Sequence, residues 1–314
     1  MNKHFLFWIL IALLSACKPA GESEESNQPK DNIVCTTSMI ADLVRNIVGD
    51  EINVKSLMGP GVDPHLYKAT QGDLKSLKEA KLIVYNGLHL EGKMTDILEQ
   101  MGEYRNVIAI EHFVEDSLII KLDQNANISD PHIWFDVQLW ASSIDGFSRE
   151  LCALFPSHCE TIESNSTAYK TELQKLHNWV RQKIEQIPED QRILITAHDA
   201  FEYFGRAYNM EVRGLQGIST LSEFGLKDRV DLVNFIVENK IKAVFVESSV
   251  PRKNIEAIVE GCQQKNHSVI IGASLYSDAM GEPGTTEGTY IGMVQHNVQS
   301  IVNALTRNTD SYEN

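Results

Sequence analysis

Residues 159–188 read CETIESNSTAYKTELQKLHNWVRQKIEQIP and predict one long amphipathic helix in the middle of the chain. Apolar side chains recur in it at spacings of three and four residues, which places them on one stripe of a helix. Pro188 cannot continue the helix and ends the pattern. The side chains of the stripe are Tyr169, Leu173, Leu176, Val180, Ile184 and Ile187.

On both sides of this helix, short apolar strands alternate with helical segments, a pattern typical of parallel sheets covered by helices. Before it, strands are expected at 33–36, 52–58, 82–85 and 107–110, and helices at 40–48 and 94–101. After it, strands are expected at 192–196, 211–215, 243–246 and 269–271, and helices at 200–208, 226–239, 254–264 and 287–305. The predicted fold is α/β, with two lobes of mostly parallel sheet joined by one long helix.

We place the domain boundaries accordingly. An N-terminal lobe is expected at residues 32–158, the linking helix at 159–188 and a C-terminal lobe at 189–314. One helix between two lobes is a stiff connection, unlike a flexible linker.

The first 16 residues have the pattern of a secretory signal peptide, with a basic start at Lys3 and an apolar run at 5–14. That run is shorter than the roughly 20 residues that span a bilayer as a helix. It is followed by Leu14-Ser15-Ala16-Cys17, which resembles the bacterial lipobox, where the cysteine is lipidated and becomes the mature N-terminus. Residues 17–31 are polar and rich in charge, Pro and Ser, and indicate a flexible tether behind a lipid.

Composition narrows the class of partner. The formal net charge is −15, which argues against nucleic acid, because its binding proteins need a basic face to displace counterions. The acidity is compatible with capture of a cation but does not establish it. Hydrophobic residues make up 43% of the chain, enough to bury substantial cores.

Besides Cys17 the chain has four cysteines, too few and too scattered for a disulfide scaffold. Cys152 and Cys159 flank a predicted turn between two helices, and the sequence leaves open whether they pair in an oxidising compartment. Their spacing is wrong for a zinc knuckle. Cys35 and Cys262 are expected to be buried thiols.

One short motif occurs twice in the first lobe. Residues 63–67 read DPHLY and residues 130–134 read DPHIW. Proline removes the helical option from the aspartate before it, so each histidine, His65 and His132, follows a defined turn. A single such histidine is usually an ordinary loop residue, but two copies favour a shared role as ligands.

Two residues of the second lobe follow predicted strands, where ligand sites of α/β sheets lie. His198 comes after an apolar strand, although its position also suits a helix-capping turn with Asp199. Asp278 precedes a loop rich in Gly and Pro, and a solvated loop aspartate is the alternative interpretation. Three imidazoles and one carboxylate suit Zn²⁺, Mn²⁺ or Fe²⁺. An ion held by all four would bridge the cleft between the lobes.

With these motifs the chain resembles the metal-specific substrate-binding lipoproteins of bacterial ABC importers, the zinc- and manganese-binding group, over nearly the whole mature chain. The matching segments are 61–65 (GVDPH), 86–91 (NGLHLE), 130–134 (DPHIW), 197–201 (AHDAF) and 274–278 (SLYSD).

The resemblance implies an exported, lipid-anchored receptor, at the periplasm or the cell surface, that passes one Zn²⁺ or Mn²⁺ ion to an ABC permease and its ATPase. It maps the family's four metal ligands onto His65, His132, His198 and Asp278. The receptor is expected to be a monomer held at the membrane through Cys17. His89, in the second matching segment, lacks the Asp-Pro turn and is expected to be structural.

Two features that separate zinc from manganese members disagree here. Zinc-dedicated members often carry a His-rich insert in the first lobe, whereas residues 111–129 contain only His112. Members that favour manganese often have glutamate where this chain has His198. The resemblance therefore leaves the metal as zinc or manganese.

Other functions fit less well. A catalytic zinc usually keeps an open position beside three protein ligands, whereas four ligands would close this site, so we do not expect an enzyme. The chain also lacks a His-Glu-x-x-His helix and a Gly-x-Ser-x-Gly elbow. A metal-stabilised surface adhesin is the alternative function, although it would not need a cleft.

The lipobox-like motif gives a direct test of anchoring. Cys17→Ser should release the protein from membranes or block its maturation, because serine cannot accept the thioether-linked lipid. Membrane fractionation and the mass of the mature protein measure this. Unchanged fractionation and mass would remove the lipoprotein assignment.

Overall fold

The computed structural model describes residues 32–123, 128–221 and 225–306. The predicted signal peptide, the lipidated Cys17 and the tether lie outside the described residues. Within the described ranges, the structure has no helix that is both long and apolar enough to cross a membrane.

The first sheet is parallel throughout and has the strand order β2-β1-β3-β4. Successive side chains of its strands enter two different cores, as the two-residue period of a strand requires. Ile33 and Val84 face one hydrophobic cluster, whereas Val34 and Ile83 face another. The strands are β1 (Asn32–Cys35), β2 (Asn53–Ser56), β3 (Leu82–Tyr85) and β4 (Val107–Ala109).

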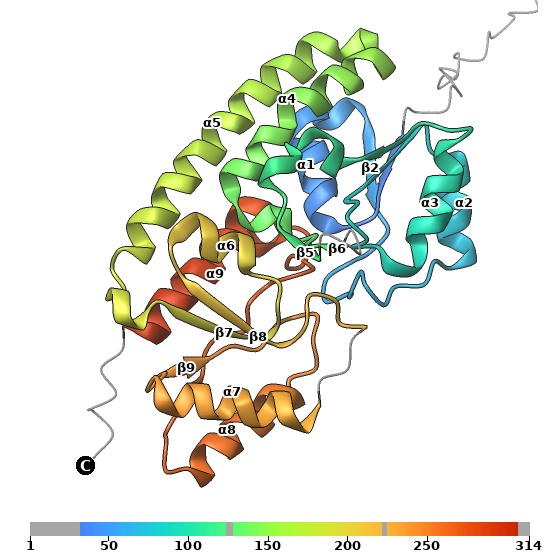
Figure 1. The fold of residues 1–314 in the computed structure, drawn as a ribbon. Helices are drawn as coiled ribbons and strands as arrows, with labels where there is room; N and C mark the ends of the chain where they lie inside the picture. Colours follow the sequence, from blue (N-terminus) through green and yellow to red (C-terminus); the bar gives the residue numbers. More distant parts are fainter. Residues whose placement is uncertain (1–31, 124–127, 222–224, 307–314) are drawn as a thin grey trace, which may run out of the picture. The chain divides into compact units, whose positions relative to one another are not determined.

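Helices cover both faces of this sheet (Figure 1). One face packs against α1 (Ser38–Val48) and α4 (Val137–Leu154), and the other against α2 (Gln71–Glu79) and α3 (Thr95–Gly102). The helix α2 is additional to those expected, whereas α4 is the helix expected before the turn that Cys152 and Cys159 flank. A small antiparallel pair, β5 (Lys121–Asp123) with β6 (Ile128–Ser129), completes this part of the chain.

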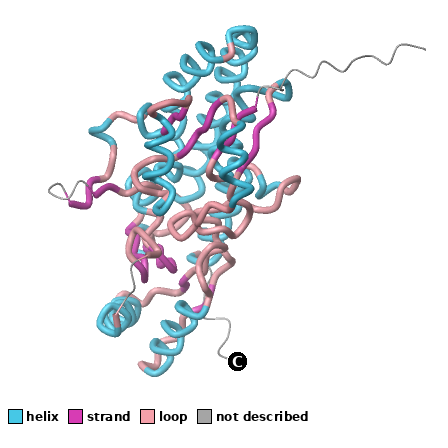
Figure 2. Tube along the Cα trace, turned by 90° about the vertical axis from the view of Figure 1, so that its right-hand side faces the viewer, coloured by secondary structure: helices cyan, strands magenta, loops and turns pink. Residues whose placement is uncertain are grey.

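The second set of strands is also parallel but is paired less regularly. One pair is β7 (Ile193–His198) with β8 (Glu211–Gln216), and the other is β9 (Ala243–Val244) with β10 (Ile270–Ile271). The amide of Phe245 donates to the carbonyl of Ile195 at 2.8 Å and joins the two pairs. The helices here are α6 (Glu202–Tyr208), α7 (Leu226–Glu238) and α8 (Lys253–Gln264). In Figure 2 the strands, in magenta, lie in separate groups with pink loops between them.

The long helix α5 (Cys159–Ile184) confirms the helix predicted between the two lobes. All six residues of the predicted stripe are buried, with exposed fractions of 5% or less. Each fully buried Leu, Ile or Val contributes roughly 1.5–3 kcal/mol relative to an exposed one. The cluster that they join contains Ile33 of the first sheet and Leu194 of the second, so one core extends over both lobes.

The last helix, α9 (Tyr290–Leu305), packs against α5 and returns to the first lobe (Figure 1). At its start, the amide of Tyr290 donates to Oδ2 of Asp42 at 3.2 Å, and its hydroxyl donates to the carbonyl of Trp134 at 2.6 Å. The lobes are therefore held together by packing as well as by the linking helix. The boundaries placed at residues 158 and 188 stay predictions.

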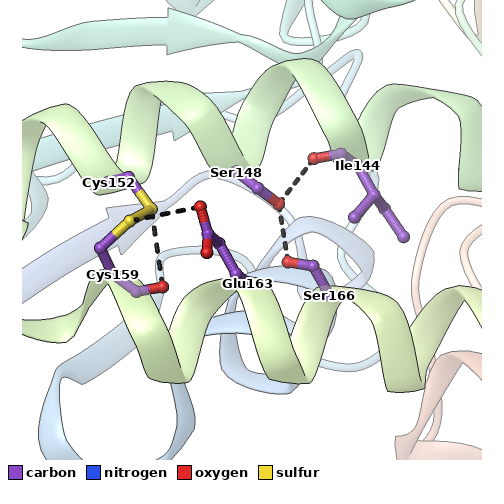
Figure 3. The surroundings of a disulfide bond; sticks show 6 residues. All are labelled: Ile144, Ser148, Cys152, Cys159, Glu163 and Ser166. Atoms are coloured by element: carbon purple, nitrogen blue, oxygen red, sulfur yellow. Dashed lines mark hydrogen bonds between the residues drawn. A yellow bond between two sulfur atoms is a disulfide. The ribbon is translucent and has the colours of Figure 1, made fainter.

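Cys152 and Cys159 form a disulfide across the turn between α4 and α5 (Figure 3). The hydroxyls of Ser148 and Ser166 share a hydrogen bond of 2.6 Å between the same two helices. The thiols of Cys35 and Cys262 are free and buried, as expected. The sequence left this pairing open, and the structure brings the two cysteines close enough to bond, with their Cα atoms 4.6 Å apart.

Candidate metal centre

The four candidate ligands come from four separate segments. His65 lies in the loop after β2, and His132 lies between β6 and the 3-10 turn η5 (Ile133–Phe135). His198 is the last residue of β7, and Asp278 follows a short parallel bridge between Glu247 and Leu275. Two segments belong to each lobe, as the sequence predicts.

The structure brings these four side chains together. Each offers a nitrogen or oxygen atom, and all four atoms lie within 4.8 Å of one another. The rings of His65, His132 and His198 surround one region, with centroids 5.3–6.1 Å apart. The four residues are 0–2% exposed.

The spacing of the donor atoms fits a single ion. Oδ1 of Asp278 lies 3.4 Å from Nε2 of His132, and its Oδ2 lies 3.3 Å from Nε2 of His198 and 3.9 Å from Nε2 of His65. Bonds of about 2.0–2.1 Å to a tetrahedral zinc would separate neighbouring ligand atoms by about 3.3 Å. Two of the three separations match this value, and the one to His65 is longer.

The same donor atoms have no hydrogen-bond partner. They are Nε2 of His65, His132 and His198, and both carboxylate oxygens of Asp278. Leaving a buried polar atom unpaired costs free energy, and such atoms are rare in folded proteins. A cation bound where these atoms converge would give each of them a partner. The residues present therefore fit a divalent metal as the bound substrate. The role of these four residues as ligands stays a prediction.

Asp130 orients the ring of His132. Its Oδ1 lies 2.7 Å from Nδ1 of His132 and also accepts the backbone amide of that residue at 2.9 Å. This contact directs Nε2 toward Asp278, and metal-binding imidazoles are usually fixed in the same way. Trp134, the aromatic residue of the motif, packs against the ring, with centroids 5.2 Å apart.

Glu247 has the same role for His198, and sequence reasoning did not identify it. Its Oε2 lies 2.5 Å from Nδ1 of His198, and its Oε1 accepts the amide of His198 at 2.8 Å. A usable signal existed, since Glu247 directly follows the apolar strand predicted at 243–246, at the carboxyl end where sites lie. Asp199 lies near the start of α6, but the N-cap of this helix is Phe201 and no side-chain hydrogen bond caps it.

His65 is supported through its backbone. Oδ1 of Asp63 accepts its amide at 2.9 Å. Gly92 lies against its carbonyl, at a φ of +37°, and a Cβ on Gly92 would lie only 2.5 Å from that oxygen. In this copy of the motif the aromatic residue has another role, because the hydroxyl of Tyr67 donates to Asp73 at 2.7 Å.

Burial and charge act in opposite directions on the imidazoles. Burial lowers the pKa of His65 to about 3. Burial also disfavours charge on His132, but Asp130 and Asp278 outweigh it and raise the pKa to about 9. Glu247 and Asp278 raise the pKa of His198 in the same way against burial. Although burial alone would raise the pKa of Asp278, the imidazoles, His198 first, hold it well below its usual range. A metal must displace protons from this site, so its affinity should fall as the pH falls.

The other histidines lie apart from this group. His89 has a φ of +62° in a turn in which Oε1 of Glu91 accepts the amide of Asn86 at 2.7 Å. It lines a 450 Å³ pocket that contains none of the four candidate ligands. His112 lines the same pocket. Four further histidines contact other groups: His158 contacts Glu51, His177 contacts Tyr208, His267 contacts the carbonyl of Ile241 and His296 contacts the carbonyl of Ser274.

The chain is similar to known metal-binding proteins over nearly its whole length. Residues 33–304 match the family model of the periplasmic zinc-uptake complex component A. The chain is 47% identical over 292 residues to the manganese-binding lipoprotein MntA of Bacillus subtilis, covering 93% of this chain and 95% of MntA. It is 46% identical over 287 residues to the zinc-binding protein TroA of Treponema pallidum, covering 91% and 92% of the two chains.

A solved structure of the periplasmic zinc-binding protein TroA from Treponema pallidum superposes with a TM-score of 0.85, over 88% of this chain and all of that one. The sequences of these two chains are 47% identical. A more distant relative, 30% identical over 312 residues, is the metal ABC transporter substrate-binding lipoprotein ScbA of Streptococcus cristatus. That match covers 96% of this chain and 98% of ScbA.

The contact between Glu247 and His198 gives a test of the site. Glu247→Gln should weaken Zn²⁺ binding about 10- to 100-fold, because the ring of His198 loses the carboxylate that orients it. Titration against a chelator of known affinity measures the change. Glu256→Gln, in an exposed ion pair of α8, is the matched control and should bind as the wild type does. Equal affinity in both variants would contradict the orienting role.

Proposed function

Because this chain belongs to the family of the periplasmic zinc-uptake complex component A, we propose that it captures one divalent transition-metal ion and delivers it to an ABC importer. The observation that carries this proposal is the buried group of three imidazoles and one carboxylate whose facing atoms have no hydrogen-bond partner. The ion is the transported substrate and not a resident cofactor.

Each residue has a part in this function. His65 and His132 supply nitrogen ligands from the first lobe, and His198 and Asp278 supply a nitrogen and an oxygen ligand from the second. Asp130 and Glu247 hold two of the rings. Since the ligands are divided between the lobes, the ion joins the lobes when it binds, and the importer meets a form that differs from the empty one.

A receptor agrees better with this site than an enzyme does. Four protein ligands fill a tetrahedral zinc, whereas a catalytic zinc keeps one position for water or substrate. The adhesin alternative has no comparable support, since ScbA, which aligns over nearly its whole length, is named as a transporter component.

The partners and the location follow from the same assignment. We expect an ABC permease and its ATPase as partners, and attachment of a monomeric receptor to the membrane through lipid on Cys17. The relatives MntA and ScbA are named as lipoproteins, which agrees with the lipobox-like motif.

The ligand set can be tested residue by residue. Wild-type protein should bind one high-affinity equivalent of metal per chain and melt at a higher temperature when loaded, because the ion binds the folded form. His65→Ala, His132→Ala, His198→Ala and Asp278→Ala should each weaken binding more than the roughly 10- to 100-fold that loss of an outer partner causes. His89→Ala is the control and should bind normally. Two tight equivalents, or full affinity in any two of the four variants, would show that the set is wrong.

Donor chemistry predicts the preferred metal. Affinity for first-row divalent ions is higher for Zn²⁺ than for Mn²⁺, and a site with three nitrogen donors favours zinc further. We therefore expect Zn²⁺ to bind more tightly, with Mn²⁺ still bound. His198→Glu should narrow the gap by exchanging a nitrogen for an oxygen donor. Competition titrations of both proteins decide the question, and a wild type that prefers Mn²⁺ would show that donor chemistry does not set the order.

A further inference from the structure

The two Asp-Pro-His copies use their aspartates differently. In the second copy, one oxygen of Asp130 contacts both the amide and the ring of its histidine. In the first copy, Oδ1 of Asp63 accepts the amide of His65 at 2.9 Å. Its Oδ2 accepts a hydrogen bond of 2.6 Å from the hydroxyl of Thr220, which belongs to the second lobe. Asp63 therefore links the His65 loop to the opposite lobe.

Thr220 is in turn connected to the strand that carries His198. The side-chain amide of Gln216 donates to the carbonyl of Thr220 at 3.4 Å. Gln216 pairs with His198 in the register of β7 and β8. A continuous path thus runs from one candidate ligand to another around the rim of the site, through Asp63 and Thr220, without passing through the ion.

The same first-lobe loop approaches the second lobe at another point. Gly61 has a φ of +68°, and a Cβ built on it would lie 3.4 Å from the carbonyl of Ser248. Ser248 directly follows Glu247, the residue that orients His198. The loop that presents His65 therefore lies against the segments that present the second-lobe candidate ligands, and the bond between Thr220 and Asp63 links the loop to that lobe through side chains.

The chemistry of this bond suits a closing contact. A hydroxyl that donates to a carboxylate forms a charge-assisted hydrogen bond, which is shorter and stronger than a neutral one. Asp63 and Thr220 are both only partly buried, so water can replace the partner of either when the loop moves away. A bond of this kind holds the loop without locking it permanently.

We propose that Asp63 and Thr220 form an interlobe latch, a positioning pair that holds the His65 loop against the second lobe and slows the release of the bound ion. This inference rests on the proposed function, because it concerns retention of the metal. The latch acts on the rate of opening, whereas the four ligands determine whether an ion is bound at all.

Thr220→Val tests the latch, since valine keeps the shape of threonine and removes its hydroxyl. Zn²⁺ release from loaded protein into excess chelator, followed by stopped flow, should become about 3- to 10-fold faster, because one charge-assisted bond is lost. The stoichiometry should stay at one ion per chain, and the melting temperature of the metal-free protein should stay the same. Thr220→Ser, which keeps a hydroxyl, should restore slow release.

Two further proteins complete the experiment. Ser219→Ala removes the neighbouring hydroxyl, which accepts the amide of Leu221, and should release metal at the wild-type rate. In an Asp63→Ala background, Thr220→Val should add nothing further, since the two residues act through one bond. Wild-type release rates in Thr220→Val would overturn the latch alone. A wild type that takes up no metal would overturn the proposed function and the latch with it.

Discussion

The charge of buried carboxylates is the constraint on which this site depends. Asp278, Asp130 and Glu247 are each no more than 4% exposed, and all three lie against imidazoles. Buried charges are tolerated when they are paired. Protons on His132 and His198 can supply the balance in the empty protein, and a divalent ion can supply it in the loaded one. The raised pKa values of these two imidazoles and the affinity for a cation thus have the same origin.

The framework around the site fixes the two pairs of candidate ligands relative to each other. The residues of α5 and α9 join both lobes in one hydrophobic cluster, and Tyr290 bonds to Asp42 and Trp134 of the first lobe. On the other side, the hydroxyl of Tyr203 on α6 donates to the carbonyl of Asp130 at 2.9 Å. Fixed groups therefore flank the second Asp-Pro-His copy, whereas the first copy sits in a loop held by Asp63.

Local patterns predicted much of this arrangement. The stripe on α5 and the two-residue period of the strands depend on neighbours in the sequence, so the two α/β lobes and their helix were predictable. The repeated Asp-Pro-His motif indicated His65 and His132 for the same reason. The pairing of Glu247 with His198 and of Asp63 with Thr220 was not predicted, because each joins residues 49 or 157 positions apart. Such contacts depend on how the strand ends and the lobes meet in space, which periodicity in the sequence does not reveal.

Similarity to known proteins does not identify the metal either, since MntA and TroA are named for different ions at nearly equal identity.

Burial of all four candidate ligands separates the chemistry that holds an ion from the kinetics of its release. With exposed fractions of 0–2%, neither water nor a competing chelator can reach the ion while the lobes are closed. Metal exchange then requires the protein to open. The exchange rate is therefore set by how often the protein opens and not by the lability of the bonds to the metal. An importer that binds the open form would draw ions out without competing for them as a ligand. The same receptor could then supply ions whose intrinsic exchange rates differ widely.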